Sequence, residues 1–77
     1  MFPLSLTPFN TNVYRVHTAQ GEHVGNLKRV GSIWKFKAIG TDTTGDVVPG
    51  GGPLTLQHNT VVQEPDAALL NAALQAP

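Results

Sequence analysis

The residues best suited to chemistry in this sequence are its cations, because they cluster along the chain. All five basic residues lie between positions 15 and 37, and four of the five acidic residues follow them. Alternation along a strand over 33–39 puts Lys35 and Lys37 on one face, which Arg15 is expected to share. The remaining cations are Lys28 and Arg29, one of which joins this face, depending on where a bulge in their own strand falls. Such a face is a candidate for binding the phosphates of a nucleic acid.

Two features argue for a simpler interpretation of these cations. Glu22 lies near them in the chain and offsets part of their charge. Single-strand binders stack bases on aromatic rings that share the basic face. Here Tyr14, Trp34 and Phe36 are predicted to point to the opposite face, into the core. A solvated outer face that discourages aggregation at the sheet edges accounts for the same residues.

A glycine-rich loop is the second candidate site. Gly50, Gly51 and Gly52 lie between Pro49 and Pro53. Consecutive glycines let a backbone approach a ligand closely or present N–H groups to an anion. The loop lacks the Lys-Ser/Thr and the following helix of a phosphate-binding loop. It is therefore either a recognition loop or a wide connection between strands that prolines stiffen at both ends.

Metal and catalytic chemistry have weaker support. His17, His23 and His58 have no metal-binding spacing, although His17 and His23 flank one hairpin. Asp42 and Asp46 flank a glycine turn, where aspartates usually bond to their own backbone. Neither serine lies in a nucleophile motif. We expect no catalytic residues, no metal and no cofactor, and hence a protein that is not an enzyme.

Composition limits the remaining possibilities. The chain has 77 residues, no cysteine and zero formal net charge, with 13% charged residues. This share is well below the roughly 25% that is usual for globular domains. The length predicts a single domain over residues 1–77 with one modest core. Weak charge favours association between copies. No secretory signal or membrane-spanning run is evident, so a cytoplasmic location without membrane contact is expected.

The elements that must position these residues are mostly strands. Gly and Pro/Asn/Asp clusters separate the apolar segments. A bulge at Gly25 explains why Val24 and Leu27 are three residues apart. The predicted strands are Phe2–Thr7, Val13–Thr18, His23–Val30, Ile33–Ile39, a short strand from Val47, and Leu54–Val62. Because of its prolines, the first of these is at best an edge strand.

A helix is predicted over Asp66–Ala76. Pro65 indicates its start, because proline is tolerated in the first turn of a helix. Leu70 and Leu74 belong to an apolar stripe that must pack on the sheet or on a partner. The prediction is therefore a mainly β domain, a four- to five-stranded antiparallel meander covered by this helix. A small barrel-like roll is the alternative. The predicted core comprises Tyr14, Val16, Leu27, Trp34, Phe36, Leu54 or Leu56, Leu70 and Leu74.

Two functional hypotheses follow from these observations. The first is a protein–protein interaction or self-assembly module, such as a homodimer formed through an open sheet edge or the helix. The second is a weak nucleic-acid-binding protein that uses its basic sheet face. Salt separates the two, because phosphate binding weakens steeply as salt rises and apolar association does not.

Overall fold

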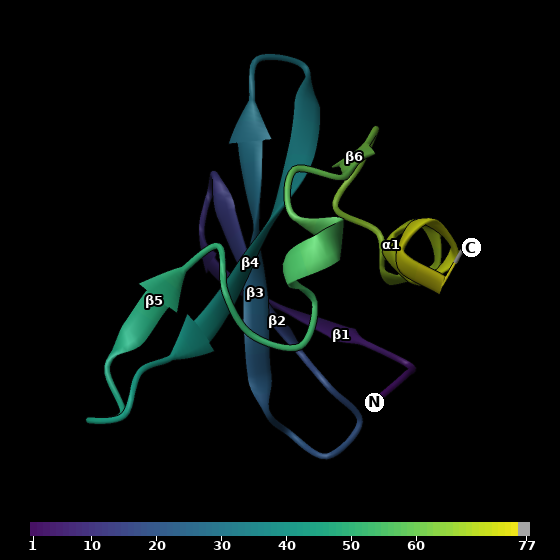
Figure 1. The fold of residues 1–77 in the computed structure, drawn as a ribbon. Helices are drawn as coiled ribbons and strands as arrows, with labels where there is room; N and C mark the ends of the chain where they lie inside the picture. The colour runs from purple at the N-terminus through teal and green to yellow at the C-terminus, as the bar shows by residue number, and fades with distance from the viewer. Residues whose placement is uncertain (76–77) are drawn as a thin grey trace.

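A computed structural model describes residues 1–75 and builds its sheet around three central strands. These are β2 (Val13–His17), β3 (His23–Val30) and β4 (Ile33–Thr41), which are rich in the β-branched and aromatic residues that favour strands. β1 (Ser5–Asn10) pairs with β2, and β5 (Val47–Pro49) pairs with the end of β4. The sheet is antiparallel in the order β1-β2-β3-β4-β5, which confirms the meander (Figure 1). Within the described residues β1 and β5 do not pair, so the sheet is not a closed barrel.

The predicted bulge lies in β3. Val16 pairs with Gly25 and His17 pairs with His23, so the register skips Val24. The extra residue lets Val24 and Leu27 both reach the core, although they are three positions apart. It also fixes the phase of the rest of β3, which decides how the cations of this strand are oriented.

The first strand is an edge strand, as predicted, but its bounds differ from the prediction. It begins at Ser5 and continues through Pro8 to Asn10, instead of covering Phe2–Thr7. Proline is tolerated there because, among residues 1–75, β1 pairs with β2 alone and one side of its backbone needs no partner. Leu4, just before the strand, is buried in the core.

The segment Leu54–Val62 was predicted to be one strand, and this prediction is wrong. Thr55–Gln57 forms a short 3-10 helix, η1, and only β6 (Val61–Val62) is a strand. Leu54 is buried, whereas Leu56 is 95% exposed. The backbone N–H of Gln57 donates to the carbonyl of Leu54 at 2.9 Å, so local turn bonds replace the pairing that a strand would need.

The irregular segment completes the outer edge of β4. β6 pairs with Trp34 and Lys35, and β5 pairs with residues 39–41, which leaves a gap between them. The Nδ1 atom of His58 fills part of this gap by accepting a hydrogen bond from the backbone N–H of Ala38 at 3.0 Å. The carbonyl of Ala38 accepts from the N–H of Gly50 at 2.7 Å. A histidine ring thus replaces a strand as the partner of a buried backbone group.

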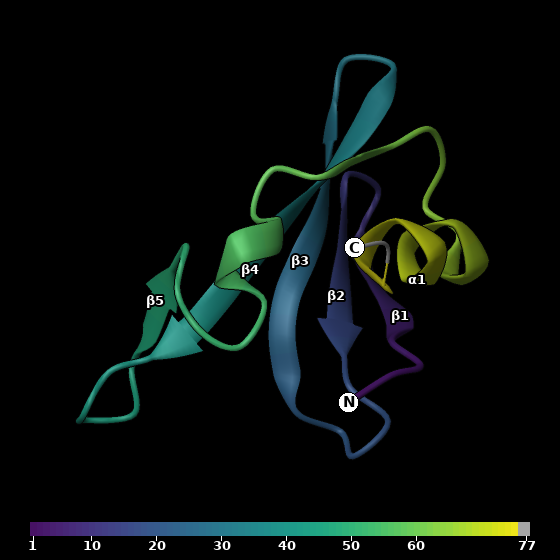
Figure 2. The same cartoon turned by 45° about the vertical axis from the view of Figure 1, so that its right-hand side comes forward.

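The C-terminal helix, α1 (Ala67–Gln75), begins after Asp66. A carboxylate oxygen of Asp66 accepts hydrogen bonds from the N–H groups of Ala68 and Leu69, at 2.8 and 3.1 Å, as an N-cap does. The predicted helix end, Ala76, lies outside the described residues. The side-chain amide of Asn71 holds the helix to the start of the chain: its oxygen accepts from the N–H of Leu4 at 2.7 Å and its nitrogen donates to the carbonyl of Leu4 at 2.9 Å. Figure 2 shows α1 beside β1, near the N-terminus.

The core lies between the sheet and α1, as predicted. Phe36 and Leu27 are its largest fully buried side chains. Tyr14 and Trp34, predicted to be interior residues, are half-buried at its margin, where their rings meet edge to face with centroids 5.5 Å apart. The buried residues that pack together as this core are Leu4, Val16, Val24, Leu27, Phe36, Ala38, Leu54, Val62, Leu70 and Leu74.

Candidate nucleic-acid interface

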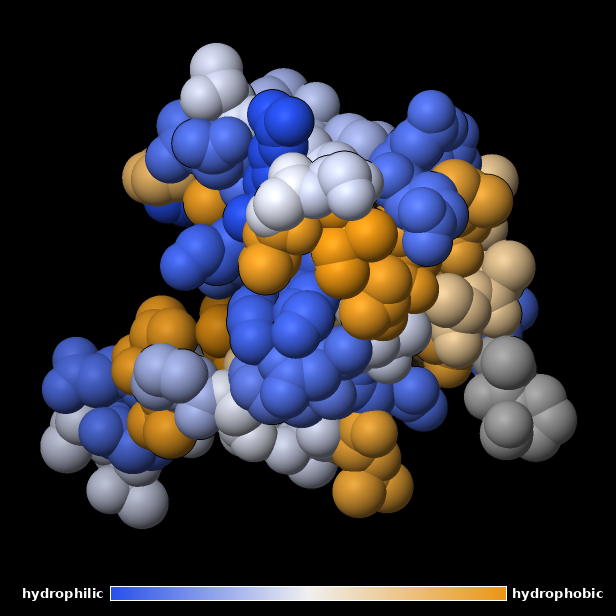
Figure 3. Space-filling model, turned by 90° about the horizontal axis from the view of Figure 1, so that it is seen from above, coloured by the Kyte–Doolittle hydropathy of each residue, from blue (hydrophilic) through white to orange (hydrophobic). Residues whose placement is uncertain are grey.

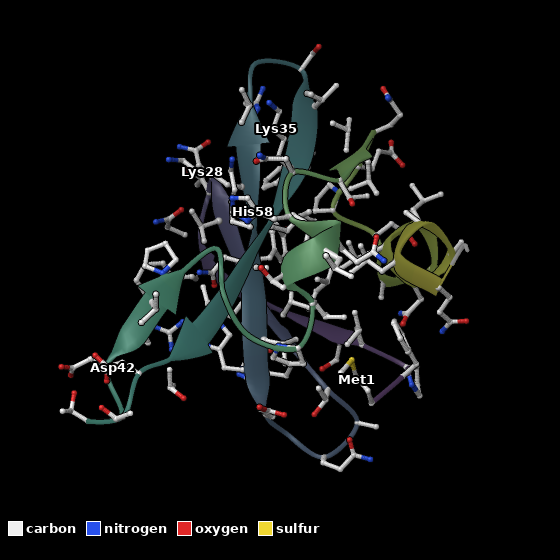
Figure 4. The ribbon with its side chains drawn as sticks, in the orientation of Figure 1. Met1, Lys28, Lys35, Asp42 and His58 are labelled. Carbon is white, nitrogen blue, oxygen red and sulfur yellow. The ribbon has the colours of Figure 1, made fainter. Side chains whose placement is uncertain are left out.

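Four of the five cations lie on one face of the central strands, called here the outer face because the core packs on the other side. The strand register aligns Arg15 with Asn26, and Asn26 with Lys37. The next row aligns Lys28 with Lys35. Arg15, Lys28, Lys35 and Lys37 therefore form one cluster. Figure 4 shows Lys28 and Lys35 in the upper half of the sheet, on the side away from α1.

Arg29, the fifth cation, does not belong to this cluster. It pairs with Trp34 and so lies on the opposite face of β3. Its Nε–H donates to the carbonyl of Gly31 at 3.1 Å, which ties it to the neighbouring turn. The bulge at Val24 determines which residues of β3 point to the outer face. Lys28, and not Arg29, therefore joins the other cations there.

The outer face has an unfavourable charge arrangement for an isolated protein. Lys28 and Lys35 are direct cross-strand partners, and like charges at opposed positions destabilise a sheet. None of the five carboxylate side chains lies within β2, β3 or β4. Lys37 finds a neutral partner, because its Nζ donates a hydrogen bond to the side-chain oxygen of Asn59. The local field of this cluster is therefore positive, although the chain as a whole is neutral.

An exposed aromatic ring shares the outer face, and it was missed by sequence reasoning. Phe9 in β1 is 59% exposed. The guanidinium carbon of Arg15 lies 4.6 Å from the centroid of the Phe9 ring, a cation–π contact. The available signal was the alternation of residues 5, 7 and 9, but the strand was predicted to end at Thr7. The three rings considered from the sequence lie elsewhere: Phe36 is in the core, with Tyr14 and Trp34 at its margin.

Two histidines extend the outer face along β2 and β3. The rings of His17 and His23 stack with centroids 5.0 Å apart and an interplanar angle of 27°. His23 Nε2 lies 2.9 Å from the side-chain oxygen of Asn26, at hydrogen-bond distance. His58 belongs to the edge of β4 instead. Over residues 1–75 no three potential metal ligands come together, and no cavity is present.

Aliphatic side chains continue the outer face at its other end. Val30 pairs with Ile33 one row beyond the lysine pair, and Val61 of β6 pairs with Lys35. Val30 and Val61 are 42% and 43% exposed. In the view from above, hydrophobic residues (orange) form a patch that hydrophilic residues (blue) border directly (Figure 3). The outer face thus combines cations, amides, rings and aliphatic groups.

The glycine-rich loop packs closely on β4. A Cβ atom on Gly40 would lie 2.5 Å from the backbone nitrogen of Gly52, so neither position has room for a side chain. The hydroxyl of Thr55 donates to the carbonyl of Gly50 at 2.5 Å and closes the loop. Gly51 is half-buried. Close backbone packing therefore accounts for small residues in this loop without a ligand.

The paired aspartates organise the turn between β4 and β5. One carboxylate oxygen of Asp42 accepts hydrogen bonds from the hydroxyl of Thr44 at 2.6 Å and from the backbone N–H of Asp46 at 3.0 Å. The hydroxyl bond first, and then the backbone bonds, hold the pKa of Asp42 below its ordinary value. As predicted for turn aspartates, the carboxylate bonds its own backbone.

Comparison of this chain with protein-family models, with curated proteins and with solved structures finds no match. Among residues 1–75, no helix has the length and apolar character needed to cross a membrane. The functional argument therefore depends on the outer face itself. Its charges, amides and exposed ring suit non-covalent binding of an extended anionic partner.

Proposed function

We propose that this protein is a non-enzymatic module that binds nucleic acid through its outer face. The observation that carries the proposal is the direct opposition of Lys28 and Lys35, with Arg15 and Lys37 in the adjacent row. This arrangement costs stability in the free protein. A polyanion neutralises the repulsion and gains free energy from counterion release, so the same arrangement favours binding.

The expected salt dependence follows from the number of cations. Four basic side chains contact at most about four phosphates, which for a single strand gives a slope of log K against log salt near −2.8. Such a slope makes binding weaken steeply as the salt concentration rises. It also makes each cation testable, because the loss of one phosphate contact reduces the slope by about 0.7.

The test is fluorescence anisotropy with a labelled oligonucleotide over a series of salt concentrations. Lys28→Gln is compared with Arg29→Gln, because the two variants change the net charge equally at neighbouring positions on opposite faces. We expect Lys28→Gln to weaken binding and flatten the salt dependence, and Arg29→Gln to retain both. Equal effects of the two substitutions, or no binding to the wild-type protein at low salt, would contradict the proposal.

Self-association is a second proposal, favoured by the open edge of the sheet. In the described part of the chain β1 pairs with one strand, β2, so its other edge offers backbone groups to another copy or another protein. Zero net charge weakens repulsion between copies. Pro8 removes one N–H donor from this strand, which limits the pairing. Sedimentation at high protein and high salt concentration tests the idea, and a monomer under those conditions would rule it out.

A further inference from the structure

We infer that the outer face takes single-stranded nucleic acid, with one base stacked on the ring of Phe9. This inference rests on the proposed function and names the ligand class more narrowly. Its observation is separate from the lysine pair: an exposed aromatic ring stands beside the cations on the same face of the sheet.

The position of Phe9 follows from the register of β1. Thr7 pairs with Arg15, and the register shifts between Pro8 and Asn10, so Phe9 lies in an irregular stretch next to the Arg15 row. Arg15 lies over one side of the ring, while 59% of the residue stays exposed. The cation–π contact therefore orients the ring, and the exposed part of the residue is available to a planar group.

Duplex DNA cannot use this ring, because its bases are already stacked inside the helix. A single strand offers its bases to an aromatic side chain and its phosphates to the neighbouring cations. From β1 to β4 the outer face spans three strand spacings, about 14 Å. One short strand therefore reaches from Phe9, past Arg15, to the pair formed by Lys28 and Lys35. Asn26, between Arg15 and Lys37, adds an amide to this path.

The experiment measures the affinity of Phe9→Ala, Phe9→Leu and Phe9→Trp for a labelled single strand of about 16 nucleotides. The same proteins are titrated with the matching duplex and with polyglutamate. Leu56→Ala is the control, because it removes another exposed apolar side chain from a different part of the fold. We expect Phe9→Ala and Phe9→Leu to lose about 5- to 150-fold in single-strand affinity, the range found for one stacked base.

We expect Phe9→Trp and Leu56→Ala to retain wild-type affinity and the duplex affinity of every variant to stay unchanged. Fluorescence of the introduced tryptophan should be quenched by the single strand beyond any change in the wild-type protein. If Phe9→Ala binds the single strand as the wild-type protein does, while Lys28→Gln does not, base stacking is refuted and the proposed function stands. If polyglutamate competes as well as the oligonucleotide, the partner is an acidic protein and the inference fails. If no polyanion binds, both fail.

Discussion

Replacing Gly52 by alanine tests whether the glycine-rich loop needs glycine there because its backbone packs closely on β4. Gly52 has a φ of 82°, and a Cβ atom there would collide with the carbonyl oxygen of Ile39. Gly21 offers a matched control, because its φ is 90° and no atom of residues 1–75 lies within 4 Å of its added Cβ. Both substitutions place alanine in the left-handed region, but only Gly52→Ala adds a steric conflict with β4.

The two costs can be separated. Alanine in the left-handed region costs about 1–2 kcal/mol, and this applies to both variants. Overpacking against a fixed backbone adds about 1–3 kcal/mol for Gly52→Ala alone. The carbonyl of Ile39 cannot move away freely, because the adjacent Ala38 is held by hydrogen bonds to His58 and Gly50. We therefore expect Gly52→Ala to be less stable than Gly21→Ala by about 1–3 kcal/mol.

Urea unfolding followed by tryptophan fluorescence measures this difference, since Trp34 is the single tryptophan of the chain. In thermal unfolding, each kcal/mol corresponds to a shift of about 4–8 °C for a domain of this size. Equal free energies of unfolding for the two variants would refute the close approach of the loop to β4. The recognition-loop hypothesis would then regain the support that the packing argument removes.

Three further predictions concern individual contacts. Gly25→Ala puts a Cβ atom 2.5 Å from the ring of Phe36, so we expect a loss of about 1–3 kcal/mol in urea unfolding, and an unchanged midpoint would disprove this contact. His58→Phe keeps a ring but removes the acceptor for the buried N–H of Ala38; we expect a loss of about 1–3 kcal/mol and faster hydrogen exchange of that amide, whereas an unaltered exchange rate would show that the bond is absent. Because the pKa of Asp42 in the folded protein lies below its ordinary value of 3.8, its ionised carboxylate stabilises the turn at neutral pH, and this stabilisation is lost as the pH falls below 3.8 and through the lower pKa of the folded protein. The NMR signals of the turn amides should therefore shift over this acidic range. Asp42→Asn should abolish the shift.

Much of the fold was predictable because its determinants are local. Alternation over 33–39 identified the inward position of Phe36 and the outward positions of Lys35 and Lys37, since successive side chains of a strand point to opposite faces. The glycine at position 25 indicated the bulge. Pro65 and the leucine stripe located the helix and its buried face, because helix starts and helical periodicity depend on residues close in the chain.

The candidate site was only partly predictable. The clustering of cations is visible in the composition of residues 15–37, but the choice between Lys28 and Arg29 depends on which residue of β3 the register skips. The aromatic neighbour of the cations was missed, because the prolines suggested an early end to the first strand. Phe9 reaches Arg15 only through the pairing of β1 with β2.

By itself the sequence determined the order of strands and turns, the inward and outward faces of the central sheet, and the helix, all of which depend on neighbours along the chain. Tertiary structure alone decided the conformation of residues 54–60. Leu54 and Leu56 are in phase for a strand, yet β5 and β6 already pair with parts of the edge of β4. The remaining backbone groups on that edge, including the N–H of Ala38, bond to His58 and neighbouring loop residues. Which partner satisfies a buried N–H depends on the three-dimensional arrangement of distant segments, and alternation along one segment does not contain that information.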